Sequence, residues 1–345
     1  MTEPAIRLSR RAFHALVIGA TVSLTAIAVP ASAAEAVKIG VLSLTSHSAA
    51  FIAKEKGYFE EQDLDAELVT FQAAGPMAVA IASGDIDFGV TAISGALINL
   101  AEKGAVKVIG GALTEEKGVD GQKILVSNAA YEDGVTTPAD LKGRSFGITG
   151  TGSSFHYMIS QIAEKEGYSV ADVDLKALQK VPAIIGALKS GQIDAWSIVP
   201  HIAKGLDGSG GAKIIGDVAD YIDGYQVTTI FTSTRNVEEN RELVERFLAA
   251  YSKGIAEFNA TMVDKTEGEE AQEATTQLIH KYVYTDRPYE KAAGPIKAGA
   301  MRLQPNGRLN IASVEHQLNW FKSEGLVDEA IELDTLVDTS FVETQ

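Results

Sequence analysis

Short apolar runs alternate along this chain with longer stretches in which apolar residues recur every three or four positions. The short runs predict buried strands, and the longer 3.6-residue period predicts the helices between them. Strands that alternate with helices in this way need crossover connections, which favours mostly parallel sheets flanked by helices. The expected fold class is therefore α/β. The predicted strands are residues 37–42, 66–71, 86–90, 106–113, 123–127, 144–149, 174–178, 193–199, 213–216 and 226–233.

One phrase of the sequence occurs twice. Residues 76–89 read PMAVAIASGDIDFG, and residues 182–197 read PAIIGALKSGQIDAWS. Upstream of these copies stand AKEKGYFEEQDLDAEL and AEKEGYSVADVDLKAL. Each copy predicts a helix, a strand, a Pro-started helix ending at Ser-Gly, and an Ile-Asp strand. The repeat predicts two similar α/β lobes with a cleft between them, the usual place for a small molecule.

The β-branched run at residues 226–233 departs from this repeat, and we interpret it as the strand that returns the chain to the first lobe. Residues 34–128 and 226–345 are then assigned to lobe one, and residues 129–225 to lobe two. After that strand the pattern is helical, with helices expected at 237–262, 270–284, 289–300 and 311–325.

The first 33 residues have the pattern of a signal peptide. A basic start with Arg7, Arg10 and Arg11 precedes an apolar run, and Ala-Ser-Ala at residues 31–33 is a typical cleavage site. Ser-Arg-Arg-Ala-Phe at residues 9–13 also fits a twin-arginine signal, so the twin-arginine and general secretory routes both remain open. Either route predicts export to the periplasm.

Length and charge narrow the function further. The chain has 345 residues, enough for two domains, and a net charge of −16. A nucleic-acid partner is not expected, because such proteins need a basic surface for the phosphate backbone. The absence of cysteine excludes thiolate metal sites and a Cys nucleophile. Neither a cofactor nor a bound metal is predicted, and no motif of a known hydrolase stands out.

Candidate ligand-binding residues follow from the rule that ligands bind at the carboxyl ends of strands, where loops lead into helix N-termini. The loops so chosen are rich in hydroxyl side chains and glycine, which suit a polar or anionic head group. Any one of these residues could instead simply cap its helix. Trp196 is either a core residue of lobe two or a surface for stacking a solute. The candidates are Ser46, His47, Thr91, Ser94, Thr151, Gly152, Ser153, Ser154, His156 and Trp196.

Several stretches give the chain a family resemblance: AIASGDIDFGV, DLKGRSFGITGTGSS, ALKSGQIDAW, and NWFKSEGLVDEA near the end. The sequence resembles the periplasmic substrate-binding proteins of ABC importers, in the group serving sulfonates, nitrate, taurine and thiamine-pyrimidine precursors. The resemblance implies a type II-like two-lobed fold with a two-stranded hinge that closes on the solute. Val199 stands before Pro200 where relatives that bind zwitterions carry an acidic residue, which disfavours a ligand amine.

The resemblance also implies how the protein acts. The leading hypothesis is a monomeric, non-enzymatic binding protein that captures a small organic solute, anionic as a sulfonate or carboxylate is. It would then deliver this solute to a membrane permease. The alternative is an enzyme on the same fold that acts on a cofactor precursor or small organic acid. The signal peptide favours the first hypothesis.

Overall fold

The computed structural model describes residues 1–2 and 33–345, and Ala34–Gln345 form one compact unit. The predicted signal peptide, residues 1–33, lies almost entirely outside the described residues and stays a prediction. Within the part of the chain that the structure describes, no helix is both long enough and apolar enough to cross a membrane.

The first lobe is built on a five-stranded sheet of order β2-β1-β3-β10-β4. Strand β1 pairs in parallel with β2 and β3, whereas β10 runs antiparallel to its neighbours β3 and β4. The strands are β1 (Glu35–Leu42), β2 (Leu64–Phe71), β3 (Phe88–Thr91), β4 (Val106–Gly111) and β10 (Thr229–Ser233). The helices that follow the first strands are α1 (Ser48–Glu55), α2 (Ala74–Ser83) and α3 (Gly95–Glu102).

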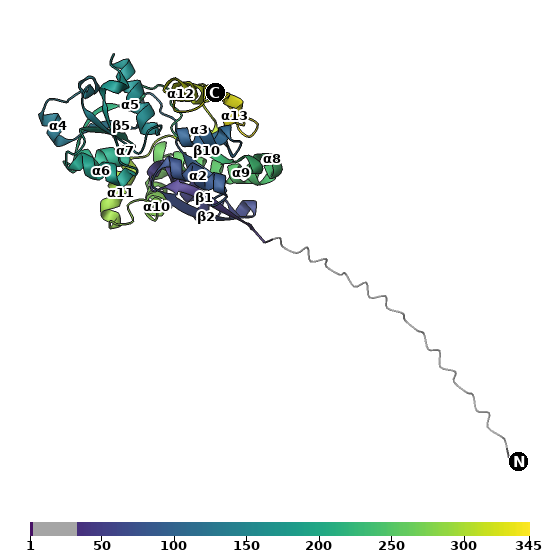
Figure 1. The fold of residues 1–345 in the computed structure, drawn as a ribbon. Helices are drawn as coiled ribbons and strands as arrows, with labels where there is room; N and C mark the ends of the chain where they lie inside the picture. Colours follow the sequence, from purple (N-terminus) through teal and green to yellow (C-terminus); the bar gives the residue numbers. More distant parts are fainter. Residues whose placement is uncertain (3–32) are drawn as a thin grey trace. The chain divides into compact units, whose positions relative to one another are not determined.

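The second lobe repeats this plan with the order β7-β6-β8-β5-β9, in which β5 is the antiparallel strand. Figure 1 shows its helices gathered around that sheet, apart from α2 and α9 beside the first one. The strands are β5 (Lys123–Val126), β6 (Ser145–Ile148), β7 (Asp174–Ala177), β8 (Ala195–Ile198) and β9 (Lys213–Asp217). The helices are α4 (Asn128–Glu132), α5 (Ser154–Lys165), α6 (Val181–Lys189) and α7 (Pro200–Gly208).

The repeated phrase makes the same contacts in both lobes. The Asp87 carboxylate accepts the backbone N–H of Lys38 at 2.8 Å, and the Asp194 carboxylate accepts that of Ser145 at 2.8 Å. A Cβ added at Gly147 would lie 2.7 Å from Ile184 and Ile193, so a helix and a strand pack directly on the backbone there. Gly40 of the first lobe is packed against Met77 and Ile86 in the same way. The predicted pair of α/β lobes is confirmed.

Two extended segments connect the lobes and are hydrogen-bonded to each other. The N–H of Ala112 donates to the carbonyl of Thr228 at 2.9 Å, and the N–H of Glu115 donates to that of Tyr225 at 2.8 Å. These segments form the two-stranded connection expected of a hinge. One strand assignment was wrong: residues 123–127 were placed in lobe one, yet β5 pairs with β8 and β9 of the second sheet. The chain therefore leaves the first sheet between Gly111 and Lys123, earlier than residue 128.

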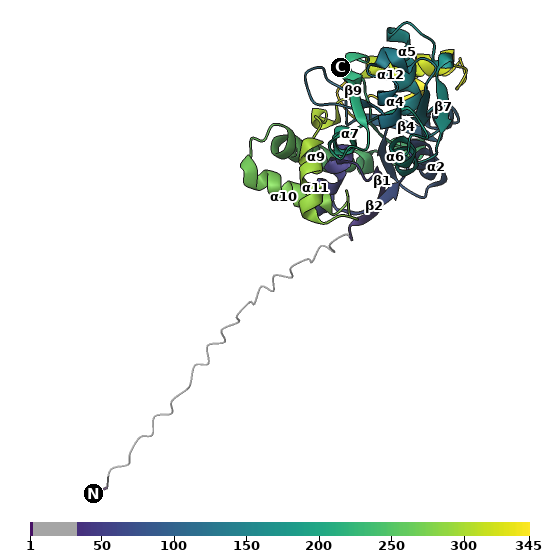
Figure 2. The ribbon, with the colours of Figure 1, turned by 90° about the vertical axis from the view of Figure 1, so that its left-hand side faces the viewer.

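The C-terminal helices pack on both lobes. Helix α9 (Arg241–Phe258) covers α1, and α11 (Tyr289–Ala298) contacts α7 of the second lobe (Figure 2). The single helix predicted at 237–262 is in fact α8 (Thr234–Glu239) and α9, separated at Asn240. The other helices are α10 (Gly268–His280), α12 (Ile311–Ser323) and α13 (Leu333–Leu336).

Candidate functional site

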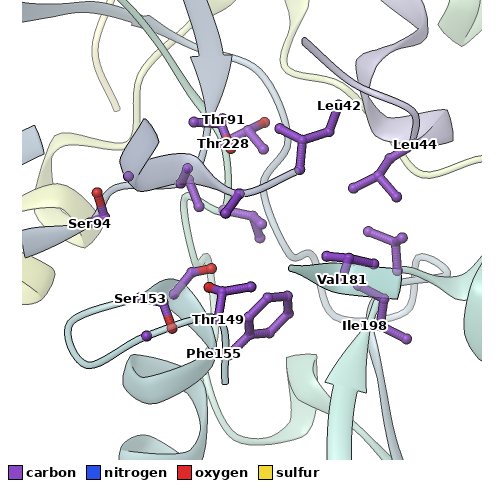
Figure 3. A pocket seen from close by; sticks show the side chains of 18 of the residues that line it. Leu42, Leu44, Thr91, Ser94, Thr149, Ser153, Phe155, Val181, Ile198 and Thr228 are labelled. Carbon is purple, nitrogen blue, oxygen red and sulfur yellow. The ribbon is translucent and has the colours of Figure 1, made fainter. Parts of the chain in front are cut away.

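A cavity of about 430 Å³, the inner cavity, lies at the carboxyl ends of strands from both sheets. Leu42 ends β1, Thr91 ends β3 and Ile198 ends β8, and all three line it. In Figure 3, Ser94 and Ser153 lie at one end of the cavity, and Leu44 and Val181 face each other at the opposite end. The cavity thus has a hydroxyl-lined end and an apolar end.

Eight of the ten predicted site residues line this cavity. They come from the ends of three different strands, β1, β3 and β6, and the loops after them, as expected for ligand sites in open α/β sheets. The structure brings together Ser46, His47, Thr91, Ser94, Thr151, Gly152, Ser153 and Ser154. Whether they hold a ligand stays a prediction.

The other two predicted residues, His156 and Trp196, do not line the cavity. His156 lies in the first turn of α5, and its Nδ1 accepts the N–H of Gly152 at 3.2 Å, so it holds the glycine loop from behind. The ring of Trp196 is fully buried in β8, with its centroid 5.6 Å from that of Phe155. Because Phe155 lines the cavity, Trp196 supports the wall instead of forming it.

Four helices start at the cavity wall and aim their N-terminal N–H groups towards it. These are α2, α3, α5 and α6, whose first residues or caps include Ala74, Ser94, Ser154 and Val181. The positive ends of helix dipoles favour an anionic or strongly polar group at such a place. The Oγ of Ser153 is buried at this wall and has no hydrogen-bond partner among the described residues. A buried hydroxyl without a partner is uncommon and suits a ligand or ordered water.

His47 presents a neutral N–H donor at the cavity. Its Nδ1 accepts the backbone N–H of Leu42 at 3.3 Å, so Nδ1 is unprotonated and the ring proton sits on Nε2. Burial lowers the pKa of His47 to about 3, which keeps the ring uncharged at neutral pH. The Nε2–H has no protein partner in the described part of the chain and can donate to a solute.

None of the residues that line the inner cavity carries a formal charge. Behind the lining residue Gln122 lies Glu115, whose two carboxylate oxygens accept the backbone N–H of Gln122 at 3.1 and 3.3 Å. Burial raises the pKa of Glu115 to about 7. A ligand amine would therefore find no carboxylate in the cavity, as Val199 before Pro200 suggested.

The sequence did not indicate the apolar part of the wall. Residues of the lobe connections also line the cavity, and no loop-after-strand rule selects them. These residues could have been predicted only if it had been known that the two connections between the lobes pass behind the cleft. The additional residues include Leu42 and Leu44 at the end of β1, and Leu113, Gln122, Val227 and Thr228 of the connections.

Several hydrogen bonds join the lobes across the cleft, among them one from the N–H of Val181 to the carbonyl of Gln72 at 3.5 Å. The N–H of Gly95 donates to the carbonyl of Gly152 at 2.9 Å. On the other side, Thr45 Oγ1 lies 2.9 Å from His201 Nδ1 and donates its own proton to the carbonyl of Gly299. The His201 Nδ1 must then carry a proton and donate to Thr45. These bonds hold the two lobes together over the inner cavity.

The site offers no metal centre of the usual kind. Among residues 33–345, no group of three or more His, Asp or Glu side chains is placed to hold a metal ion.

Comparison with known proteins identifies the family. The family model described as NMT1/THI5 like matches residues 44–261. The chain belongs to the NMT1/THI5-like family. A protein of Brucella abortus (strain 2308), named a binding protein, is 28% identical over 201 residues, which is 57% of this chain. The match spans 59% of the length of that relative.

Solved structures of low sequence identity share the fold of this family member. The alkanesulfonate-binding protein SsuA from Xanthomonas axonopodis pv. citri, bound to MOPS, has a TM-score of 0.68 at 18% identity and is matched over 88% of this chain and 98% of its own. The periplasmic nitrate-binding protein NrtA from Synechocystis PCC 6803 has a TM-score of 0.70 at 14% identity, over 88% and 86%. The desulfurization enzyme DSZB has a TM-score of 0.57 at 16% identity, over 89% and 97%. The fold is thus the predicted periplasmic binding protein fold, and one protein that shares it is an enzyme.

Proposed function

We propose that this protein is the periplasmic solute-binding component of an ABC importer. It captures a small organic solute in the inner cavity and delivers it to a membrane permease. The observation that carries the proposal is a cavity whose wall comes from two hinged lobes and contains a buried, unpartnered Ser153 hydroxyl. A solute held by both lobes favours the arrangement in which they meet, which is how such a protein signals that it is loaded.

The polar end of the inner cavity supports an anionic solute. The N-termini of α3 and α5 meet beside Ser94 and Ser153, and His47 adds a neutral donor. Directed donors without a counter-charge suit a sulfonate, a carboxylate or another small oxyanion. The structures named as alkanesulfonate- and nitrate-binding proteins agree with this class of solute.

The test is thermal unfolding of the purified protein, stripped of solute by denaturation and refolding. The panel contains organic sulfonates, carboxylates, nitrate and pyrimidines. A solute present at about 100 times its Kd should stabilise the protein by about 2.7 kcal/mol, a readily measured shift in Tm. The proposal would be falsified if a solute bound tightly yet left the inner cavity empty in a crystal structure of the complex.

Two variants of His47 test the same site. His47→Phe removes the donor and leaves the N–H of Leu42 unpaired, and should weaken solute binding at least tenfold. His47→Gln retains an amide donor of similar reach and should lose less solute affinity.

Mass spectrometry of the solute after long incubation separates binding from catalysis. Recovery of unchanged solute supports the proposal, and conversion to product supports an enzyme.

A further inference from the structure

A second cavity of about 500 Å³, the outer cavity, adjoins the inner one. Leu42, Leu44 and Val181 line both, so these side chains form the boundary between the two spaces. Leu44 and Val181 lie at the apolar end of the inner cavity, away from Ser94 and Ser153 (Figure 3). A solute that lies along the inner cavity would therefore point its far end at the outer cavity.

The outer cavity differs from the inner one in its charge. The residues that line it include Lys189 and Arg287, against a single acidic residue, Asp286. Lys189 has no ion pair or side-chain hydrogen bond among the residues that the structure describes, and Arg287 Nε lies 4.0 Å from Asp286, too far for a hydrogen bond. The outer cavity therefore has an excess of positive charge and unused donors.

Arg287 is held in place by strained backbone and by stacking. Tyr284 adopts a left-handed conformation with φ of 59°, which is unusual for a bulky side chain. Its ring lies under the guanidinium of Arg287, with Cζ 4.3 Å from the ring centroid, and its hydroxyl donates to the carbonyl of His201 at 3.0 Å. The N–H of Arg287 also donates to the carbonyl of Tyr284. Strain of this kind persists where the surroundings fix it, and it concentrates at binding sites.

The outer cavity forms only when the lobes meet. Gln72 comes from lobe one, Lys189 from α6 of lobe two, and Arg287 from the segment before α11. The side-chain amide of Gln72 has no hydrogen-bond partner within residues 33–345 and faces the same space. An anion bound here would therefore contact both lobes and favour their closure, as a solute in the inner cavity does.

We propose that one solute spans both cavities, with a polar head at the hydroxyl-lined end, an apolar middle between Leu44 and Val181, and an anionic group at Arg287 and Lys189. The substrate class is then a two-ended organic acid, with a terminal carboxylate, sulfonate or phosphate separated from the head by an apolar segment. This inference rests on the proposed function and adds to it. The combined volume lies within the usual range of ligand sites.

The test compares two series of probes on the solute-stripped protein: straight-chain dicarboxylates of four to ten carbons, and monocarboxylates of the same lengths. The wild type should bind dicarboxylates best at one length, the length that reaches Arg287, and should bind the matching monocarboxylate more weakly. Arg287→Gln combined with Lys189→Gln should raise the Kd of the best dicarboxylate about tenfold or more. The same double variant should raise the Kd of the monocarboxylate much less than that of the dicarboxylate.

Arg235→Gln is the matched control, because Arg235 is an exposed arginine on α8 paired only with Glu239. It should change neither series, and added salt should weaken dicarboxylate binding in the wild type more than in the double variant. Equal Kd values for both series, or an unchanged length optimum in the double variant, would overturn the inference. If only other members of the wider panel bind, the inference fails while the proposed function stands. If nothing binds, both fail.

Discussion

His47 and His201 are two neutral imidazoles buried at the meeting of the lobes, and they set how the protein responds to acid. Burial lowers the pKa of each to about 3, and at His201 the repulsion that a second proton would meet from a protonated His47 and from the Arg287 guanidinium lowers the pKa further. In the unfolded chain the pKa is about 6.5. Between pH 6.5 and pH 3 the unfolded state therefore binds a proton that the folded state refuses, so stability falls as the pH falls.

The variant His201→Asn isolates this effect, since an amide can still donate to Thr45 but does not titrate. Between pH 7.5 and pH 5.0 the wild type should lose about 2 kcal/mol more free energy of unfolding than the variant. Urea denaturation at the two pH values measures this difference. Glu115 acts in the opposite sense, because its raised pKa costs stability as the pH rises towards 7, but it is common to both proteins and cancels. An equal pH dependence in both proteins would contradict the burial of a neutral His201.

Among single residues, the sequence predicted the polar lining of the inner cavity better than its apolar lining. Ser46 follows β1 and Ser153 follows β6, and the strand-end rule places both at the cavity. His156 has the same polar character, but its place in the first turn of α5 puts it behind the loop. Leu44 and Val181 have no chemical signature, since an apolar residue near a strand end is as often core as cavity wall.

At the scale of elements, the loop at residues 149–153 turns from β6 into α5 and carries one of the hydrogen bonds between the lobes. Gly152 has a left-handed φ of 73°, and its carbonyl accepts the N–H of Gly95. Gly152→Ala should lower the free energy of unfolding by about 1 kcal/mol, since a Cβ is strained in this conformation. Gly150→Ala is the control, because no atom lies within 4 Å of an added Cβ there and its φ is not left-handed.

Chemical denaturation of the two alanine variants and the wild type measures the difference. We also expect a separate effect on solute affinity. It should fall in Gly152→Ala, because the altered loop no longer places the carbonyl of residue 152 to accept the N–H of Gly95. Equal losses of stability in the two variants would mean that the left-handed turn is not what fixes this loop.

Strand order shows where element prediction succeeds and where it stops. The repeat predicted the parallel strands of each lobe in the right places, because apolar runs and Ser-Gly helix ends are local signals. The antiparallel strand β5 was assigned to the wrong lobe, since nothing within KILV tells which sheet it joins. That choice is made by pairing with β8 and β9, which lie far along the chain. Non-local pairing of this kind leaves no periodic trace in the sequence.

At the scale of the whole molecule, the C-terminal segment contacts both lobes. The C-terminal helices belong in sequence to lobe one, but Trp320 of α12 donates its Nε1–H to Ser160 of α5 at 2.8 Å. Helix α11 likewise contacts α7. A rotation of the lobes about the hinge at Ala112 and Thr228 must therefore also change the contacts that the C-terminal segment makes with the two lobes. Opening of the cleft must break the bond between Gly95 and Gly152 on the side of α3 and α5.

A disulfide across that bond should lock the cleft. The chain has no cysteine, so Gly95→Cys with Gly152→Cys introduces a single possible pair. A Cβ added at Gly152 would lie 3.7 Å from the Cα of Gly95, within reach of a disulfide.

When the double variant is oxidised without solute, it should bind none of the solutes found for the wild type, and reduction should restore binding. Oxidised after loading, it should release solute far more slowly than the reduced form. Calorimetry and filter-release kinetics measure the two effects, with Gly95→Cys alone as the control. If the oxidised, empty protein takes up solute as fast as the reduced one, entry does not need the lobes to part at Gly95 and Gly152, and solute must enter past Leu44 and Val181 instead.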